Sequence, residues 1–425
     1  MKAKQVFSLP LMGKTEEKGY CLMNIQLLDG VKVIDFSTMV AAPTTARVMA
    51  DWGADVLKVE APSGDQLRGT GATMNVTATE DENPIFETDN LNKKGITLNL
   101  KSEEGYQIMM QLLEEADVFI SNIRIHSLEK LGLGYETLKA KFPHLIWGHF
   151  SGYGTKGEEA HRPGYDVVGY WARGGFMASL APVNHPPISA PSGVGDSVAG
   201  LSLLSGILAA LLKQRETGQG EEVRVSLLGS AIFCNKMMIV SSQYEDHYPK
   251  DRMHPNNPFL QSYQTKDGEW IMLCLVRYES EFPRFMKIIG LEEYIDDESV
   301  NTLDAFQKNP KQSEFVKQVE AAIGNMESQD LIDKMLAEDF TFERAQTFDE
   351  IPNDKQAWAN NYLENMEFGK EGKRVAMPAS PVQFSDDKKI PFNHAPRLGE
   401  HNQEILAGLG YSEEDIQSLK EKGVI

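Results

Sequence analysis

The sequence predicts an α/β fold in which a Rossmann-like large domain with a parallel sheet is followed by a smaller α+β domain. Residues 31–36 and 55–59 have the composition of buried strands, and a helical stretch that starts at Pro43 and stops at Gly53 lies between them. This is the pattern of a βαβ unit with a right-handed crossover. Further along the chain, a β-hairpin pattern at 263–276 precedes helices with acidic faces, which indicates the second domain.

The first βα loop is the place where a ligand is expected. It lacks the GxGxxG pattern, so a dinucleotide held in the usual way is not expected. Ligands of open α/β sheets nevertheless lie beyond the carboxyl ends of the strands, which indicates residues 38–43. Further strands of the same sheet are expected at 96–100, 117–121, 145–150 and 223–227.

Cationic and amide side chains follow several of these strands. Lys93 and Lys94 precede one strand, Arg124 and Lys130 follow another, and Tyr153 follows a third. In an acidic protein, this grouping at one edge of the sheet suggests a site for a phosphorylated ligand. The alternative is that each lysine is simply solvated, and the residues alone leave both interpretations open.

An uncharged stretch runs from Asp196 to Lys213 and predicts a central helix that is buried on all sides. It is expected to be too short, and too rich in Gly and Ser, to span a bilayer. The helix N-terminus favours an ionised carboxylate at Asp196, and Gly193 and Gly195 would let a ligand approach the backbone. Asp196 therefore has two interpretations, a helix cap or a carboxylate nucleophile.

Composition excludes several classes of partner and cofactor. The chain has 425 residues, 41% of them hydrophobic, and can bury a large core. A net charge of -20 argues against nucleic acid and anionic membranes as partners. The three cysteines form no CxxC pair and no HExxH motif is present, so neither a disulfide framework nor a metal site is expected. This suits a cytoplasmic protein.

Taken in order, several short motifs resemble those of the class III CoA-transferases, the CaiB/BaiF family. The motifs are GVKVIDF at 30–36, GADVLKVE at 53–60, NKK at 92–94, ADVF at 116–119, GDS at 195–197, TGQG at 217–220 and PRLGEH at 396–401. Residues 37–43 and 172–175 are most similar to the transferases of anaerobic amino-acid fermentation. Those enzymes attach CoA to phenyllactate or 2-hydroxyisocaproate.

The resemblance implies a reaction in which Asp196 is the nucleophile. The aspartate attacks a donor acyl-CoA of the enoyl-CoA type, forms a mixed anhydride and then an aspartyl-CoA thioester, and CoA passes to a 2-hydroxy carboxylic acid. CoA thioesters are substrates here, and neither a permanently bound cofactor nor a metal is implied. The CoA contacts of the family match Val40, Ala41, Asn92, Lys93, Asn122, Arg124, Lys130 and Tyr153. The family also implies a homodimer of interlocked rings, and a dehydratase of the same pathway is a further candidate partner.

The sequence departs from the formyl-CoA branch of that family at several positions. That branch has Gln in place of Val40, Arg in place of Ala61, and a tetraglycine flap where this chain has Pro-Asn-Asn-Pro at 255–258. A small dianionic acceptor such as oxalate is therefore not expected. An apolar pocket is expected to accept a branched or aromatic acyl chain, and it is predicted near Met39, Val40, Tyr165 and Trp171.

Two other functions remain as alternatives. A 2-methylacyl-CoA racemase shares the fold but needs a second base, a His in a Gly-His-Asp stretch, where this chain has Tyr165 between Gly164 and Asp166. A tyrosine with an ordinary pKa near 10 is a poor base for an α-proton. A non-catalytic acyl-CoA-binding subunit would keep the cationic edge and have no use for Asp196.

The expected organisation has four parts. Residues 1–26 form an N-terminal extension whose apolar part is too short and broken for a secretory signal, and Met23 is a hypothetical alternative start. Residues 27–225 form the large CoA-binding domain with the nucleophile, 226–339 the small domain, and 340–425 a C-terminal segment that returns to the large domain.

Overall fold

The computed structural model describes residues 26–425 with the exception of 72–75, 77, 80–81, 189, 245–247, 249–250, 370–371 and 386–389. The hypothetical start at Met23 and nearly all of the predicted extension lie outside the described residues.

The large lobe is built on a parallel sheet. Its strands are β1 (Lys32–Phe36), β2 (Asp55–Glu60), β3 (Lys94–Thr97), β4 (Val118–Ser121), β5 (Ile146–Ser151) and β6 (Glu222–Ser226). They lie in the order β3-β2-β1-β4-β5-β6, and every neighbouring pair is parallel. The predicted α/β class with a parallel sheet is therefore confirmed. Because the strand order reverses between β1 and β4, their carboxyl ends form the crevice in which such folds bind ligands.

Helices cover both faces of this sheet because its strands are apolar on both sides. Along β1, Val33 packs in one hydrophobic cluster with α1 and α7, whereas the next residue, Ile34, packs in another with α3 and α5. The helices of the large lobe are α1 (Ala41–Asp51), α2 (Pro84–Asn90), α3 (Glu103–Glu114), α4 (Ile125–Lys130), α5 (Tyr135–Lys141), α6 (Phe176–Leu180), α7 (Val194–Thr217), α8 (Leu227–Cys234) and α9 (Lys236–Ser241). Short turns of helix, η1 (Gln66–Arg68) and η3 (Val167–Ala172), lie between them.

The central helix α7 is buried along one face and exposed along the other. Ala199, Leu203 and Ile207, spaced four residues apart, are fully buried, whereas Leu212 is 66% exposed. The prediction of a helix buried on all sides is therefore wrong for the single chain. An apolar face of α7 is left uncovered.

Among the described residues, α7 is the one helix that is long and apolar enough to cross a membrane. The expectation that it is too short is wrong, because it has 24 residues and a span needs about 20. In the structure α7 packs on α1, and Thr45 Oγ1 donates a hydrogen bond of 2.8 Å to the carbonyl of Gly200. A Cβ at Gly200 would collide with the carbonyl of Ala41, so the small residues of α7 serve the close approach of α1.

The small lobe has its own sheet and core. Strands β7 (Ser262–Gln264), β8 (Trp270–Leu273) and β9 (Phe342–Arg344) are antiparallel neighbours in that order, so the predicted hairpin is formed by β7 and β8. Aromatic side chains such as Phe259 and Phe282 fill the core. The helices are α10 (Tyr278–Ile289), α11 (Leu303–Lys308), α12 (Gln312–Gly324) and α13 (Ser328–Ala337).

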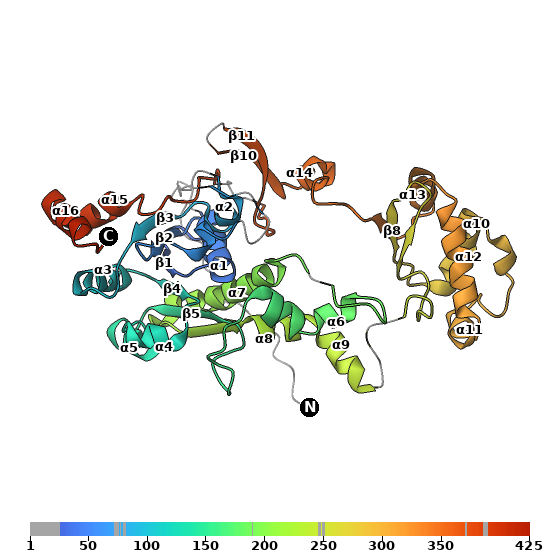
Figure 1. Ribbon diagram of the computed structural model, residues 1–425, viewed down its shortest axis with the longest axis horizontal. Coiled ribbons are helices and arrows are strands. Elements are labelled where there is room, and N and C mark those ends of the chain that lie inside the picture. The colour runs from blue at the N-terminus through green and yellow to red at the C-terminus, as the bar shows by residue number, and fades with distance from the viewer. Residues whose placement is uncertain are drawn as a thin grey trace, which may run out of the picture.

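Figure 1 shows the small lobe set apart from the large lobe. The chain passes between them after α9 and again between β9 and α14 (Lys355–Ala359). The last part forms the hairpin β10 (Leu363–Phe368) and β11 (Lys373–Pro378) and the helices α15 (Asn402–Gly408) and α16 (Glu413–Glu421). The side chain of Asn402 accepts a hydrogen bond of 2.9 Å from the backbone of Thr97, which joins the C-terminal segment to β3.

The domain boundaries at 226 and 339 stay a prediction. In the structure, Leu227 and Ala231 of α8 pack in a core cluster of the large lobe, and β9 pairs with β8 of the small lobe.

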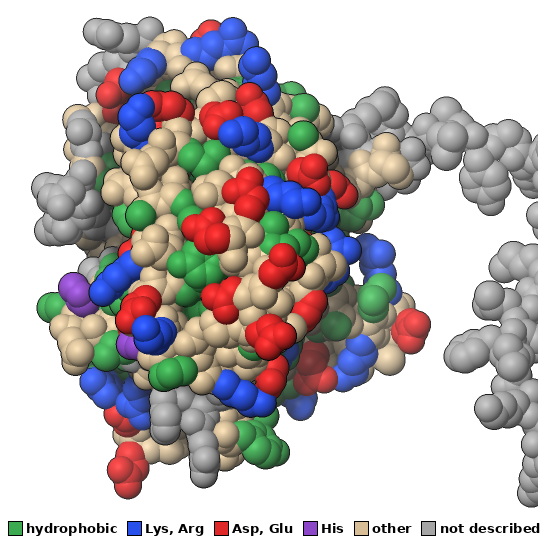
Figure 2. All heavy atoms as spheres, turned by 90° about the vertical axis from the view of Figure 1, so that its right-hand side faces the viewer, with side chains coloured by type: hydrophobic (Ala, Val, Ile, Leu, Met, Phe, Trp, Pro, Cys, Tyr) green, Lys and Arg blue, Asp and Glu red, His purple; other side chains and the backbone are tan. Residues whose placement is uncertain are grey.

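The surface of the small lobe carries Lys and Arg interspersed with Asp and Glu, with hydrophobic side chains between them (Figure 2). Charges of both signs therefore alternate across this face.

Candidate active site

A cavity of about 400 Å³ lies at the carboxyl ends of β1, β4 and β5, at the predicted place. Its walls come from the turn after β1 (residues 38–41), the turn after β4 (122–125), the end of β5 with the following loop, and Asp196 at the start of α7. Helices α1 and α7 both begin here. The first N–H groups of a helix have no acceptor within the helix, so two positive helix ends meet at one cavity.

Asp196 is the third residue of α7 and is half-buried. Burial, together with the carboxylates of Asp166 and Asp89, raises the pKa of Asp196 to about 7. The sequence predicts an ionised carboxylate at Asp196. With a pKa of about 7, this carboxyl group is only partly ionised at neutral pH. Removal from water and two like charges outweigh the favourable helix end.

Asp166 is a buried carboxylate that sequence analysis did not include in the site. It accepts hydrogen bonds from the N–H of Gly193 (2.7 Å) and from Trp171 Nε1 (3.2 Å), and it therefore binds the first turn of α7. A Cβ at Gly195 would collide with Asp166 Oδ1 and with the ring of Tyr170. Gly195 is thus needed for packing within the chain, and its role in the approach of a ligand stays a prediction.

Of the predicted CoA contacts, Val40, Ala41, Asn122 and Arg124 line the cavity together with Asp196. Asn122 also holds the opposite wall: its Oδ1 accepts from the N–H of Thr38 (2.9 Å) and its Nδ2 donates to the carbonyl of Thr38 (2.6 Å). The structure therefore brings together residues from β1, β4 and α7 that are far apart in the sequence.

The structure does not bring Lys93 to the cavity. Its side chain is 0% exposed and its ammonium donates to Asp35 (2.8 Å), to the carbonyl of Pro43 (2.9 Å) and to Asn90 Oδ1 (2.9 Å). Burial lowers the pKa of Lys93 to about 8 in spite of the nearby Asp35. Lys93 therefore forms an ion pair in the interior, and it does not belong to the cationic edge that the sequence predicts.

The other predicted contacts also lie outside the cavity lining. Asn92 bonds through its side chain to Asp51 (2.8 Å) and to the N–H of Asn393 (2.7 Å). Lys130 is exposed at the end of α4. Tyr153 is half-buried, and the guanidinium of Arg162 lies 5.2 Å from its ring centre.

The apolar pocket expected from the sequence is formed in part. Met39, Val40 and Tyr165 line the cavity. Trp171 does not belong to this lining, because its indole N–H bonds Asp166 and its ring packs edge-on against Phe176 at 5.2 Å.

Several lining residues were missed by sequence reasoning. Arg162 lines the cavity as a second guanidinium besides Arg124, and its only sequence signal was its place just before Pro163 and Gly164. His149 on β5 lies in an apolar strand, where a lone histidine gives no signal. Burial lowers the pKa of His149 to about 4, so it is neutral, and its Nε2 lies 2.9 Å from the carbonyl of Ile123. In the part of the chain that the structure describes, no group of three or more His, Cys, Asp or Glu could hold a metal ion.

Comparison with known proteins gives a consistent result. The family described as CoA-transferase family III matches residues 28–402. The chain is 38% identical to the (R)-2-hydroxy-4-methylpentanoate CoA-transferase of Clostridioides difficile over 94% of this chain and 99% of the relative. It is 37% identical to the cinnamoyl-CoA:phenyllactate CoA-transferase of Clostridium sporogenes over 95% and 98%. The crystal structure of a CAIB/BAIF family protein from Brucella suis is similar, with a TM-score of 0.78, 27% identity, and coverage of 91% of this chain and 100% of that one.

Proposed function

Because this chain belongs to CoA-transferase family III, we propose that it transfers CoA from an acyl-CoA to a 2-hydroxy carboxylic acid with Asp196 as the covalent nucleophile. The observation that carries the proposal is the position of Asp196, which lies in the first turn of α7 and lines the same cavity as the start of α1. The side chains of the site need no metal for this chemistry, since the acyl group stays activated in both the thioester and the anhydride.

The reaction is a sequence of acyl exchanges. An oxygen of Asp196 attacks the thioester carbon of the donor, the C–S bond breaks, and CoA leaves as thiolate. The donor acyl group is then joined to Asp196 in a mixed anhydride. The thiolate then attacks the aspartyl carbonyl, which releases the donor acid and leaves an aspartyl-CoA thioester. The acceptor carboxylate attacks that thioester, the C–S bond breaks, CoA leaves again as thiolate, and a second mixed anhydride forms. Finally the thiolate attacks the acyl carbon of the acceptor, which regenerates the Asp196 carboxylate.

The electrostatics of the cavity suit these steps. A carboxylate with a pKa of about 7 is more basic than an exposed aspartate and is still largely ionised slightly above neutral pH. Each attack places negative charge on a carbonyl oxygen. We propose that the N–H groups of the first two residues of α1, Ala41 and Ala42, stabilise such an oxyanion, because α1 begins beside the cavity and its third residue, Pro43, has no N–H.

For the CoA moiety, we propose contacts with Val40, Ala41, Asn122 and Arg124, all of which line the cavity. Arg124 is exposed at the mouth and is suited to a phosphate group. For the acyl group, the lining residues Met39, Val40 and Tyr165 favour a branched or aromatic chain. The two relatives at 37–38% identity have names that specify acids of this kind.

The decisive test is a competition experiment. The enzyme is incubated with cinnamoyl-CoA and an equimolar mixture of 2-hydroxy acids and simple carboxylic acids, and the acyl-CoA products are identified by mass. We expect (R)-2-hydroxy-4-methylpentanoyl-CoA or phenyllactyl-CoA to dominate. Transfer only to acids without the 2-hydroxyl group would overturn the substrate class and leave the family assignment intact.

We also propose that two chains form an interlocked homodimer. Apolar side chains of α7, α8 and α9 are open to solvent in the single chain: Leu212 is 66% exposed, Phe233 69% and Met237 70%. Exposed apolar patches of this kind mark interfaces, and the chain runs out to the small lobe and back. Light scattering should give twice the chain mass of 47.4 kDa. The proposal includes a cytoplasmic location. It also includes a dehydratase that consumes the product as a partner, and pull-down from the native host can test this association.

A further inference from the structure

The turn between β1 and α1 forms one wall of the cavity and has an unusual backbone conformation. Thr38 and Met39 line the cavity, and Met39 has a φ of 66°. The left-handed region is unfavourable for a side chain such as that of methionine. Such a conformation persists only where the surrounding structure enforces it.

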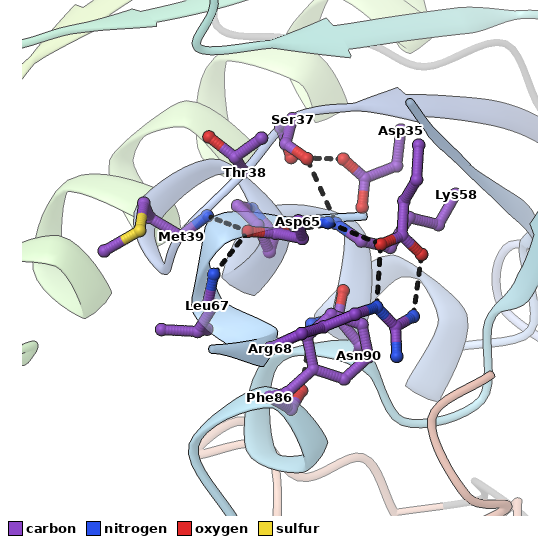
Figure 3. A network of polar contacts seen from close by, with 12 residues as sticks. Asp35, Ser37, Thr38, Met39, Lys58, Asp65, Leu67, Arg68, Phe86 and Asn90 are labelled. Atoms are coloured by element: carbon purple, nitrogen blue, oxygen red, sulfur yellow. Dashed lines mark hydrogen bonds and ion pairs between the residues drawn. The ribbon is translucent and has the colours of Figure 1, made fainter. Parts of the chain in front are cut away.

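A buried carboxylate from outside the cavity supplies that enforcement (Figure 3). Asp65 Oδ1 accepts a hydrogen bond from the N–H of Met39 (3.1 Å) and another from the N–H of Leu67 (2.9 Å). Its Oδ2 accepts from the ammonium of Lys58 at 3.0 Å. The side chains of Asp65 and Lys58 are both 0% exposed. Asp65 is therefore fixed and desolvated where it meets the peptide of Met39.

Lys58 holds the other end of the same turn. Its ammonium donates a hydrogen bond of 3.0 Å to the carbonyl of Ser37, two residues before Met39. The Lys58–Asp65 ion pair thus binds both ends of the turn through one charged unit. Figure 3 shows Asp65 below Ser37 and Thr38, with Met39 on one side of it and Lys58 on the other.

Asp65 is itself held rigidly from β2. Its N–H donates to Glu60 Oε2 (2.8 Å), and Glu60 is bound at both oxygens by Arg68 (2.8 and 2.7 Å). The guanidinium of Arg68 lies 3.8 Å from the ring centre of Phe86. Support of this kind is needed if a site is to hold its geometry within a fraction of an ångström.

We propose that Asp65 is a positioning residue for CoA transfer: by holding the Met39 peptide in the left-handed conformation, it keeps the wall formed by residues 38–41 in place in the cavity that Asp196 also lines. The inference rests on the proposed function. Asp65 lies outside the lining of this cavity, so it acts through the turn. A carboxylate is required rather than an amide, because the buried ammonium of Lys58 needs an anion and Met39 needs an acceptor at the same time.

The test compares Asp65→Asn with a matched control. The control, Asp51→Asn, removes a carboxylate from another buried ion pair of the large lobe, Arg47–Asp51. The side chains of Arg47 and Asp51 are 10% and 7% exposed, and both residues lie outside the cavity lining. Single-turnover reaction with cinnamoyl-CoA is followed by intact mass to detect CoA bound to the protein. The amplitude of this reaction reports the folded fraction, and its rate reports the geometry of the site.

We expect Asp65→Asn to keep its amplitude and to react about tenfold more slowly, because small displacements of a catalytic wall are costly. The control should differ from the wild type by less than about twofold in rate. The same Asp65→Asn change made in a Met39→Gly background should cost about threefold or less, because glycine adopts a positive φ without support.

Loss of amplitude at an unchanged rate would show that Asp65 is structural only and overturn the proposal, as would an equal loss of rate in the Met39→Gly background. If Asp65→Asn does not fold, Asp65→Glu serves instead, since it keeps the charge for Lys58 and displaces the oxygen at Met39. If the wild type transfers CoA and forms no adduct at Asp196, the proposed mechanism fails, and steady-state kcat of the same variants still decides the role of Asp65.

Discussion

Asp166 and Asp196 are two carboxylates at the same end of α7. Asp166 accepts the N–H of Gly193 at 2.7 Å, and its charge, after burial, is a principal reason why the pKa of Asp196 is raised to about 7. Burial also raises the pKa of Asp166 itself, against its hydrogen bonds from Gly193 and Trp171. The pKa of Asp196, which we propose as the nucleophile, is thus raised by a neighbour that comes from a different loop.

The pH dependence of catalysis follows from this pair. In the proposed mechanism Asp196 must be ionised to attack, so kcat/KM for the donor should fall as the pH drops through about 7 and level off above it. In Asp166→Asn, the amide can still accept the Gly193 N–H, and the like charge is gone. The midpoint should therefore move to lower pH. A pH profile of kcat/KM for both proteins checks this, and an unchanged midpoint would contradict the electrostatic coupling.

Stability should depend on Asp196 with the opposite sense. A folded-state pKa raised from 3.8 to about 7 means that the contribution of Asp196 to stability is most favourable below about pH 4, is lost progressively as the pH rises from there to about 7, and is fully lost above that pH. Asp196→Asn removes this loss, so it should be more stable than the wild type at pH 8, by roughly 2 kcal/mol after allowance for partial exposure. At pH 4 the two should be equal. Urea unfolding at both pH values measures the difference, and equal stability at pH 8 would contradict the raised pKa.

Removal of the proposed nucleophile should separate catalysis from binding. Asp196→Ala should reduce CoA transfer by about 10⁴-fold or more and leave the affinity for free CoA nearly unchanged, as measured by calorimetry. Asp304→Ala, which removes a 75% exposed carboxylate of the small lobe, serves as the control. Transfer that survives in Asp196→Ala would favour a non-catalytic role for this residue. Exchange of an α-hydrogen for deuterium without any acceptor acid would instead favour a racemase.

The close packing at the start of α7 can be tested by adding one methyl group. Gly195→Ala places a Cβ against Asp166 Oδ1 and the ring of Tyr170, and overpacking of this kind costs about 1–3 kcal/mol. The matched control is Gly408→Ala, where the Cβ of another helical glycine meets open space and a gain of roughly 0.5 kcal/mol is expected. Thermal unfolding of both variants measures the contrast. Equal stability of the two would show that the start of α7 is more loosely packed.

Some parts of the site were accessible to sequence reasoning and others were not. The alternation of apolar strands and helices predicted the parallel sheet, and the break in charge after Asp196 correctly marked the start of α7. The turn at 38–43 was indicated because ligands lie at strand ends. By contrast, Lys93 was expected at the cavity, and the structure pairs it with Asp35, which precedes it by 58 residues, in the interior. A lysine after a loop has the same local pattern whether it is solvated or buried.

The sequence by itself determined the α/β class, the family and the one carboxylate at the start of the apolar helix, since these follow from short-range periodicity and from motifs. Only the tertiary structure decided which charges reach the cavity, that Asp166 raises the pKa of Asp196, and that the buried Asp65 holds Met39 in its left-handed conformation. The physical reason is that burial and pairing depend on contacts between segments far apart in the chain, and a desolvated charge takes its properties from those contacts and not from its neighbours in sequence.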